Sequence, residues 1–446
     1  MTSDFPPGPR LSPLLQTVGF WYRPTGFVRR ARERYGRTFT MRLLGREEIV
    51  IVSDPDAARE VLTAPPDVLH PGEGARILEP LLGPNSVIVL DEDDHLQQRR
   101  VMLPPFHGES LAAAGELIEG FCERETDSWP VGEAVALHPR LQRLTLEIIL
   151  RVVFGLEQGA RLERLREALV ETLAFGENPI AILWSIPLLA RNGARVQQDR
   201  RIARVDEMLF ELIAERRAEG AGGNDVLALL LAARHEDGSP MTDRELRDEL
   251  VTALVAGHET TASQLAWAFT VLARAPWAVA RVREDLRAGS DAYLTATIQE
   301  VMRIRPVLST AEPRIVRRRF ELAGRTYEPG TILSVSALLM HRDPLIYERP
   351  ERFDPARFLD SPPGTYTWIP FGGGRRRCIG ASFALAEMHA LLRSALLRYD
   401  VAPAPGPRER TIRRGITFSP SRGAAVVLAR AVPAAEPQVA GAALAV

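Results

Sequence analysis

The chain has 446 residues, of which 46% are hydrophobic and 25% charged, and its formal net charge is -1. This composition is sufficient for a deep core, and the balanced charge gives no indication of binding to nucleic acid or to an anionic membrane. Two cysteines in so long a chain exclude a disulfide framework and are typical of a reducing compartment, so we expect a cytoplasmic protein.

Both ends of the chain lack targeting features. Residues 1–10 contain no basic stretch followed by a long apolar run, so no signal peptide is predicted. No segment reaches the roughly 18 uncharged apolar residues of a membrane span, so we expect no membrane anchor. Residues 433–446 are rich in alanine and lack periodicity, which predicts a disordered tail after a folded domain over residues 1–432.

The first predicted elements are extended. Residues 37–43 and 48–52 predict a hairpin that turns at Gly45. Asp54 and Pro55 predict the start of a helix, with the aspartate as N-cap and the proline in the first turn. Residues 64–90 are rich in proline and glycine and predict a long loop, which is often functional in a compact domain.

The middle of the chain is predicted to be helical. A long apolar helix is expected to begin at Thr242 or Asp243 and to run to about residue 274, and another helix covers 291–303 and stops before Pro306. Amphipathic helices are expected over residues 111–129, 141–154, 161–175 and 196–218.

The pattern changes after Pro306. Short β-like segments over 314–321 and 331–337 precede an irregular, proline-rich stretch over 347–371. A last helix is expected over 379–398, and strand-like residues cover 411–429. Because strands lie at both ends of the chain, we expect one large, mainly α-helical domain with a minor β-sheet.

The most informative segment is Phe371-Gly372-Gly373-Gly374-Arg375-Arg376-Arg377-Cys378-Ile379-Gly380. Its glycines are expected to deliver Cys378 to the first turn of a helix, where the helix dipole and the three arginines favour a thiolate, a soft ligand suited to iron. A phosphate-binding loop would end in Lys-Ser or Lys-Thr, and a zinc site would need several closely spaced cysteines or histidines. The segment has neither feature.

This segment resembles the haem-binding loop of the cytochromes P-450, Phe-x-x-Gly-x-Arg-x-Cys-x-Gly. All five fixed positions match, at Phe371, Gly374, Arg376, Cys378 and Gly380. The resemblance implies the cytochrome P-450 fold and haem b (iron protoporphyrin IX), with Cys378 as the axial ligand of the iron and Phe371, Arg376 and Gly380 beside the cofactor. It extends over nearly the whole chain and points to a soluble bacterial type, since no anchor helix precedes the proline-rich start.

Glu300 and Arg303 lie at i and i+3 near the end of a predicted helix. Taken alone, such a pair is usually solvated surface. In the resembled family, a Glu-x-x-Arg at this place is a buried structural pair that a downstream arginine joins. Arg357 fits this third role by its spacing from Cys378, although Pro350-Glu351-Arg352-Phe353 copies the usual motif more literally.

The segment Ala256-Gly257-His258-Glu259-Thr260-Thr261 interrupts the long apolar helix with polar residues. A threonine bonded to the preceding turn and a solvated glutamate would account for it without any function. The resemblance implies instead an acid–alcohol pair, in which Thr260 hydrogen-bonds dioxygen and Glu259 relays protons from solvent. Gly257 would leave room above the iron, and His258 occupies a variable position.

The two haem propionates require cations. His95 and Arg99 lie at i and i+4 on one face of a helix, and members of the family use such a pair for the propionates. By the same resemblance, Arg376 and Arg314 are the other expected propionate partners. A simply exposed arginine is the default for each of these cations.

The resemblance implies a haem-thiolate monooxygenase that inserts one atom of dioxygen into a lipophilic small molecule, by hydroxylation or epoxidation. Electrons are expected from a separate ferredoxin or flavodoxin and its NAD(P)H reductase, because no flavin domain or cysteine cluster remains in the sequence. We expect Arg100, Arg375 and Arg377 to form a basic surface for this donor.

Two other functions stay open. One is a peroxide-dependent or non-oxygenating haem-thiolate enzyme, and the other is a non-catalytic haem sensor or carrier; the Glu259-Thr260 pair argues against both. The substrate pocket is expected to take largely apolar residues from 64–90, 172–189, 251–257, 308–311 and 416–418.

Overall fold

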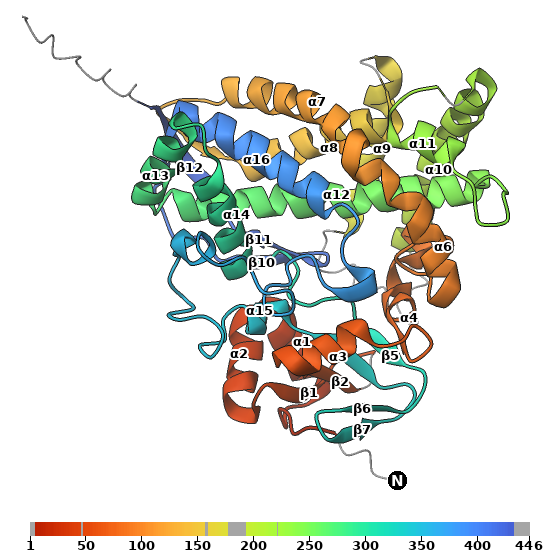
Figure 1. Cartoon of the computed structure of the whole chain (residues 1–446), viewed down its shortest axis with the longest axis vertical. Helices are drawn as coiled ribbons and strands as arrows, with labels where there is room; N and C mark the ends of the chain where they lie inside the picture. The colour runs from red at the N-terminus through yellow and green to blue at the C-terminus, as the bar shows by residue number, and fades with distance from the viewer. Residues whose placement is uncertain (1–4, 46–47, 157–158, 177–192, 221, 432–446) are drawn as a thin grey trace, which may run out of the picture.

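The computed structural model describes residues 5–45, 48–156, 159–176, 193–220 and 222–431. A body of packed helices lies above a smaller part that holds the first strands of the chain (Figure 1). The mainly helical architecture with small sheets is therefore as the sequence predicted. The predicted tail, residues 433–446, lies outside the described residues.

The β-rich part begins with two helices, α1 (Pro13–Tyr22) and α2 (Pro24–Tyr35), followed by the predicted hairpin of β1 (Thr38–Arg42) and β2 (Glu48–Val52). The hairpin joins strands from much later in the chain, in the order β1-β2-β8-β5-β3. These partners are β8 (Ile332–Val335), β5 (Arg314–Val316) and β3 (Leu69–His70). Consecutive residues of both strands are buried, so both faces of the hairpin are covered by other parts of the protein.

Helix α3 (Pro55–Thr63) follows the hairpin, and the Asp54 carboxylate accepts hydrogen bonds from its first backbone N–H groups, as expected. The prediction of a long loop over 64–90 is wrong in part, because this stretch contains short helices. The Asp91 carboxylate accepts hydrogen bonds from the backbone N–H groups of Gly72 and Glu73, both at 2.8 Å, and so caps the first of them. The capping residue lies 19 residues from the helix that it caps, so the composition of residues 64–90 could not predict this helix. The short helices are α4 (Pro71–Ala75), η1 (Arg76–Leu78) and α5 (Glu79–Leu82).

The helical body confirms the amphipathic patterns. Thr242 is the N-cap of the long helix α12 and forms a capping box with Glu245. This helix crosses the middle of the body and packs against α8 on one side and α16 on another (Figure 1). The helices of the body are α6 (Glu92–Met102), η2 (Pro104–Phe106), α7 (Gly108–Asp127), α8 (His138–Phe154), α9 (Ala160–Gly176), α10 (Gly193–Glu219), α11 (Val226–Ala232), α12 (Asp243–Leu272), α13 (Pro276–Arg287), α14 (Ala292–Ile304) and α16 (Ala381–Arg398). Helix α15 (Ala337–Met340) belongs to the β-rich part, where it packs on α2 (Figure 1).

Short strands complete the structure. The hairpin of β10 and β11 packs on α12, where the Trp267 indole N–H donates a hydrogen bond of 2.8 Å to the carbonyl of Phe418. The predicted irregular stretch 347–371 contains only one short 3-10 helix. The remaining elements are β4 (Ala134–Ala136), β6 (Phe320–Leu322), β7 (Arg325–Tyr327), η4 (Pro355–Phe358), η5 (Gly374–Arg376), β9 (Tyr399–Pro403), β10 (Thr411–Arg414), β11 (Thr417–Pro420) and β12 (Ala425–Arg430).

No helix within the described residues combines the length and the apolar character needed to cross a bilayer.

Candidate functional site

The loop that carries Cys378 is built against helix α3. Gly374 has a φ of +65°, and a Cβ atom at this position would lie 2.0 Å from the backbone carbonyl oxygen of Leu62. No side chain fits there, so the third glycine of the motif is required by the close approach of two backbones. The loop closes on itself where the Cys378 N–H donates a 2.9 Å hydrogen bond to the carbonyl of Phe371.

Cys378 is not in the first turn of α16, which corrects the sequence-based expectation. The N-cap of α16 is Gly380, so the cysteine lies two residues before it. The backbone N–H of Gly380 hydrogen-bonds to the thiol, which neighbouring chain surrounds although the residue as a whole is exposed. No protein atom lies within 4 Å of the place where a Cβ of Gly380 would stand, so this glycine leaves open space beside the sulfur.

Opposing effects act on the Cys378 thiol. Removal from water by the neighbouring chain raises its pKa, whereas the Gly380 N–H and the charges of Arg99 and Arg377 lower it. A metal cation bound to the sulfur would add to the effects that favour the thiolate.

Four of the predicted cofactor-binding side chains gather near the cysteine. Burial, followed by the charges of Arg376, Arg99 and Arg314, lowers the pKa of His95 to about 3. His95 is thus a neutral imidazole surrounded by three guanidinium groups. The structure brings together a helix, a strand and the cysteine loop, since these residues come from α6, β5 and η5.

The hydrogen bonds of the cation cluster differ in detail. Arg99 donates to the backbone carbonyl of Arg377 at 2.6 Å, which ties α6 to the cysteine loop. Arg376 donates to the carbonyls of Val87 and Leu90 and to the carboxylate of Asp91, the last at 2.8 Å. Arg376 therefore holds the 71–91 segment against the cysteine loop.

One carboxyl in this cluster was missed by the sequence. Glu312 is a half-buried residue whose carboxyl lies near the arginines; loss of water around the carboxyl raises its pKa, and the charges of Arg376 and Arg314 oppose that rise. Its Oε2 atom and the Nε atom of Arg314 are both buried without a hydrogen-bond partner. An unpartnered guanidinium N–H in a cluster of cations is suited to an additional carboxylate from a ligand.

A buried ion-pair network contacts the chain segment that precedes the cysteine loop. Arg303 donates to both oxygens of Glu300, at 2.7 and 2.8 Å, and both side chains are fully buried. Arg357 adds a contact of 3.1 Å to the same carboxylate. Arg352, the alternative for this third position, contributes only its backbone carbonyl, which accepts from Arg303 at 3.2 Å. The geometry thus selects Arg357 over Arg352.

The polar side chains of residues 258–261 in α12 contact different neighbours. The Thr260 hydroxyl donates a 2.6 Å hydrogen bond to the carbonyl of Ala256, one turn earlier in the helix. The Glu259 carboxylate points toward α8, where it accepts from the Gln142 side-chain amide at 2.7 Å. Its side chain is 15% exposed, so Glu259 is not the solvated residue of the default interpretation, nor is it in open contact with solvent.

Gly257 lies against helix α8. A Cβ atom on this residue would lie 2.9 Å from the Cδ1 atom of Ile149 in α8. Gly257 therefore allows α12 and α8 to pack closely.

Some of the residues predicted to line the substrate pocket meet around one small cavity. This cavity, between α9, α10 and α12, is lined by Leu81, Thr172, Val251, Leu254 and Val255, from three of the predicted ranges, and also by Leu169, Ile202, Val205, Asp206 and Arg247. Residues 308–311 and 416–418 do not line this cavity. Residues 177–189 of the predicted pocket lie outside the described residues.

The carboxylates Glu312 and Asp91 and the α8 residues His138 and Gln142 were not identified from the sequence. None of the four stands in a motif of fixed spacing with Cys378 or Thr260. The one available signal was His138-Pro139, a polar residue with a proline at the start of an amphipathic helix, and this is an ordinary helix beginning.

Comparison with known proteins agrees with the geometry. The family model described as "Cytochrome P450" matches residues 4–426. "Putative cytochrome P450 135B1" of Mycobacterium tuberculosis is 38% identical over 430 residues, covering 94% of this chain and 90% of the relative. "Putative cytochrome P450 138" of the same species is 37% identical over 431 residues, covering 95% of this chain and 96% of the relative.

Solved structures show the same fold. The retinoic acid bound cyanobacterial CYP120A1 superposes with a TM-score of 0.83 at 25% sequence identity, covering 96% of this chain and all of the other. The haem domain of cytochrome P450DA superposes with a TM-score of 0.82 at 22% identity, covering 96% and 98%. The match over nearly the whole length, with the cysteine loop and the cation cluster in place, shows that this chain belongs to the cytochrome P450 family of haem b monooxygenases.

Proposed function

We propose that this chain is a haem-thiolate monooxygenase in which Cys378 is the protein ligand of the haem iron and His95, Arg99, Arg314 and Arg376 hold the propionates. The observation that carries the proposal is the exposed residue Cys378 near a cluster of three arginines, of which Arg314 is buried and has an unpartnered Nε–H. Glu300, Arg303 and Arg357 keep the segment leading to the cysteine loop in place. The haem, when bound, supplies reductive activation of dioxygen, and the thiolate donates electron density that favours O–O cleavage.

The residues of α12 supply position and protons. The Thr260 hydroxyl is free to rotate from the Ala256 carbonyl toward a neighbouring acceptor, because a helix carbonyl already accepts a backbone N–H and tolerates the loss. Thr260 is then the donor to dioxygen, and Glu259, the next residue, is the acid that restores its proton. Their adjacency on one helix keeps the transfer short.

The substrate is proposed to be lipophilic. The cavity between α9, α10 and α12 is lined mainly by leucine, isoleucine and valine, and its one ion pair, Arg247 with Asp206, is satisfied within the protein. Apolar side chains in these predicted pocket ranges favour a substrate with a largely apolar surface. The cyanobacterial structure with retinoic acid shows that a protein of similar fold binds a molecule of this character.

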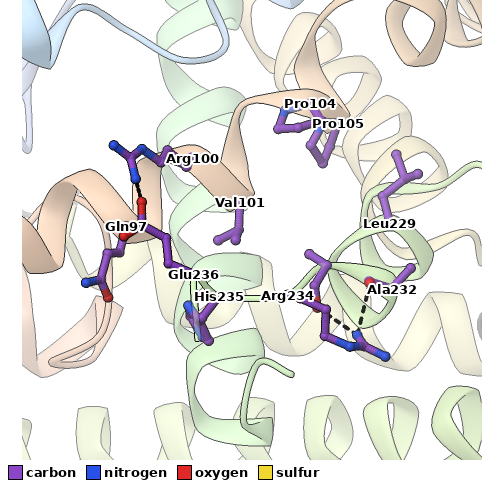
Figure 2. A pocket seen from close by; sticks show the side chains of 11 residues that line it. Gln97, Arg100, Val101, Pro104, Pro105, Leu229, Ala232, Arg234, His235 and Glu236 are labelled. Carbon is purple, nitrogen blue, oxygen red and sulfur yellow. Dashed lines mark hydrogen bonds and ion pairs between the residues drawn. The ribbon is translucent and has the colours of Figure 1, made fainter. Parts of the chain in front are cut away.

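Electrons are proposed to come from a ferredoxin or flavodoxin and its NAD(P)H reductase. Arg375 and Arg377 are exposed on the cysteine loop and suit an acidic donor. Arg100 is less suited than expected, because it pairs with Glu236 at one side of a pocket of about 430 Å³ between α6 and the end of α11 (Figure 2). The donor surface is thus centred on the loop more than on α6.

The central test replaces the cysteine. Cys378→His should abolish the red-shifted Soret band of the ferrous–carbon monoxide complex, because this band requires thiolate ligation. Cys122→Ser is the matched control, since Cys122 is the other cysteine and is buried in α7, 1% exposed. A red-shifted band that survives in the Cys378 variant would overturn the ligand assignment, and the control should keep it.

Activity is tested separately from ligation. Candidate lipophilic compounds that shift the ferric Soret band are incubated with the protein, a ferredoxin, its reductase and NADPH. Oxygenated product with matching NADPH consumption is the expected result. Product formed only with added peroxide would favour the peroxide-dependent alternative, and spectral shifts without any turnover would favour a sensor.

A further inference from the structure

The carboxylate of Glu259 is enclosed by hydrogen-bond donors from three elements. His138 and Gln142 come from α8, Ser263 from the next turn of α12, and Ser419 from β11. The Ser263 hydroxyl and the Gln142 amide each lie 2.7 Å from a carboxylate oxygen. Such a set of donors stabilises an anion and fixes its direction.

His138 is the one member of this set that can carry charge. Its side chain is buried, and its Nε2 atom lies 3.3 Å from Oε1 of Glu259 and 3.2 Å from the Ser263 hydroxyl. With a carboxylate opposite, Nε2 carries the proton in either charge state of the ring. The Nδ1 atom is buried without a hydrogen-bond partner, so the contact with Glu259 and Ser263 is what orients the imidazole.

The other titratable group beside Glu259 does not compete for this role. His258 is the preceding residue of α12, and its Nδ1 atom is 3.2 Å from the Thr145 hydroxyl. Burial lowers the pKa of His258 to about 4, so it is neutral at physiological pH. The residues contributed by β11 are threonine, phenylalanine, serine and proline, none of which titrates in this range.

The contacts favour the ionised form of Glu259. Burial by itself would raise the pKa of this carboxyl, but the hydrogen bond and charge of His138, together with Ser263 and Gln142, lower it to about 2. The same contacts turn the carboxylate toward α8, whereas the Thr260 hydroxyl is bonded to the carbonyl of Ala256. An acid that serves Thr260 must accept a proton and change direction.

We propose that His138 is a positioning residue for proton delivery, which holds Glu259 as an anion on the α8 side of α12 until the His138–Glu259 contact opens. The inference rests on the proposed role of Glu259 as the proton donor to Thr260. Opening of the contact frees the carboxylate to take up one proton from water and to pass that proton to the Thr260 hydroxyl, after which the anion returns to His138. The ring thus limits proton entry to a short interval and reduces premature release of peroxide.

The test uses the haem-loaded enzyme with its electron donors and a substrate found as above. In the wild type, Glu259 stays ionised from about pH 5 to about pH 8, so product formed per NADPH should show no ionisation of this group. In His138→Leu, burial is opposed only by neutral donors, and the pKa of Glu259 rises. We expect a new inflection in product per NADPH within this range and a several-fold increase in peroxide.

Companion variants separate positioning from structure. His138→Gln keeps a neutral hydrogen-bond donor and should restore much of the product formed per NADPH. Ser263→Ala removes one neutral donor from Glu259 and should change the pH dependence of product per NADPH less than His138→Leu does. In the double variant His138→Leu/Glu259→Gln, the new inflection should disappear, because it belongs to Glu259. An inflection that persists there would overturn the inference.

The two proposals fail in different ways. If Glu259→Gln forms as much product per NADPH as the wild type, the proton role of Glu259 and the inference about His138 are both wrong. If Glu259→Gln forms less product per NADPH but the yield of His138→Leu does not depend on pH, only the inference about His138 is wrong. Should His138→Leu not fold, infrared difference spectra of the wild-type and Glu259→Gln holoenzymes decide: a protonated Glu259 band at about pH 6 would contradict an anion held by His138.

Discussion

Arg303 and Glu300 form a two-bonded ion pair, with N···O distances of 2.7 and 2.8 Å and no exposed side-chain surface on either residue. The remaining N–H groups of Arg303 donate to the carbonyls of His341, Pro350 and Arg352, and the backbone N–H of Asp354 donates to Glu300. The pair is thus the point where α14 holds the irregular segment that leads to the cysteine loop.

Removal of one partner of this pair should be strongly destabilising. Arg303→Leu leaves the Glu300 carboxylate buried with only Arg357 and a backbone N–H, and we expect a loss of about 3–5 kcal/mol in the free energy of unfolding and little bound haem. Arg281→Leu is the matched control, because Arg281 and Glu284 also lie three residues apart but are 52% and 68% exposed. Urea unfolding should show a loss of about 1 kcal/mol or less for the control. Equal losses in the two variants would contradict the structural role.

Gly374→Ala should prevent the cysteine loop from closing on α3. The new Cβ would meet the Leu62 carbonyl oxygen at 2.0 Å, in a residue that also has a φ of +65°. Gly289→Ala carries the conformational strain without the clash, since its φ is +81° and no atom lies within 4 Å of the added carbon. We expect about 1–2 kcal/mol for the control and a larger loss, with a reduced haem content, for Gly374→Ala. A haem content equal to that of the control would argue against the clash.

Thr260→Ala should consume NADPH while forming little oxygenated product. The alanine variant keeps the fold, because the hydroxyl bonds only to a carbonyl of its own helix. Without the donor to dioxygen, product per NADPH should fall by at least about tenfold, and peroxide should increase. Substrate binding, followed by the Soret shift, should be unchanged. Thr270→Ala is the control, since Thr270 makes the same bond to Ala266 farther along α12.

Glu249 should make the stability of the protein depend on pH. Burial raises the pKa of this carboxyl to about 8, although the Val87 N–H donates to it at 2.7 Å. The folded-state pKa is above the unfolded value, so the contribution to stability is complete below about pH 4 and is lost as the pH rises toward about 8.

Glu249→Gln removes this ionisation and keeps a carbonyl acceptor for Val87. The variant should equal the wild type in urea unfolding near pH 5 and exceed it by on the order of 2 kcal/mol near pH 9. A constant difference over this range would show that Glu249 does not titrate as its burial implies.

Charge reversal on the cysteine loop should slow electron delivery. Arg377→Glu is expected to reduce the association rate of an acidic ferredoxin, and the wild-type rate should fall with salt because attraction is screened beyond about 8 Å at physiological ionic strength. Arg100→Glu should have a smaller effect, since Glu236 already neutralises Arg100. Stopped-flow reduction over a salt series measures both effects. A rate that ignores salt and the Arg377 reversal would remove the docking proposal while leaving the haem assignment intact.

The sequence by itself determined the elements whose signals are local. The Asp54 cap, the start of α12 at Thr242 or Asp243 and the amphipathic helices depend on residues within one or two turns of each other, and the sequence predicted them. The cysteine motif belongs to the same class, because its fixed spacing within ten residues reflects one loop. The convergence of His95, Arg99, Arg314 and Arg376 was predicted from the family resemblance alone.

Only the tertiary structure decided the contacts that join distant segments. The Asp91 cap on α4, the preference for Arg357 over Arg352 and the packing of Gly257 on Ile149 all depend on where other helices and loops lie. The same is true of Glu259, whose sequence neighbours suggested a solvent relay but whose carboxylate is held by His138, more than 100 residues earlier in the chain. Burial and charge at a site are sums over all neighbouring atoms, and a sequence pattern specifies only those within a turn or two.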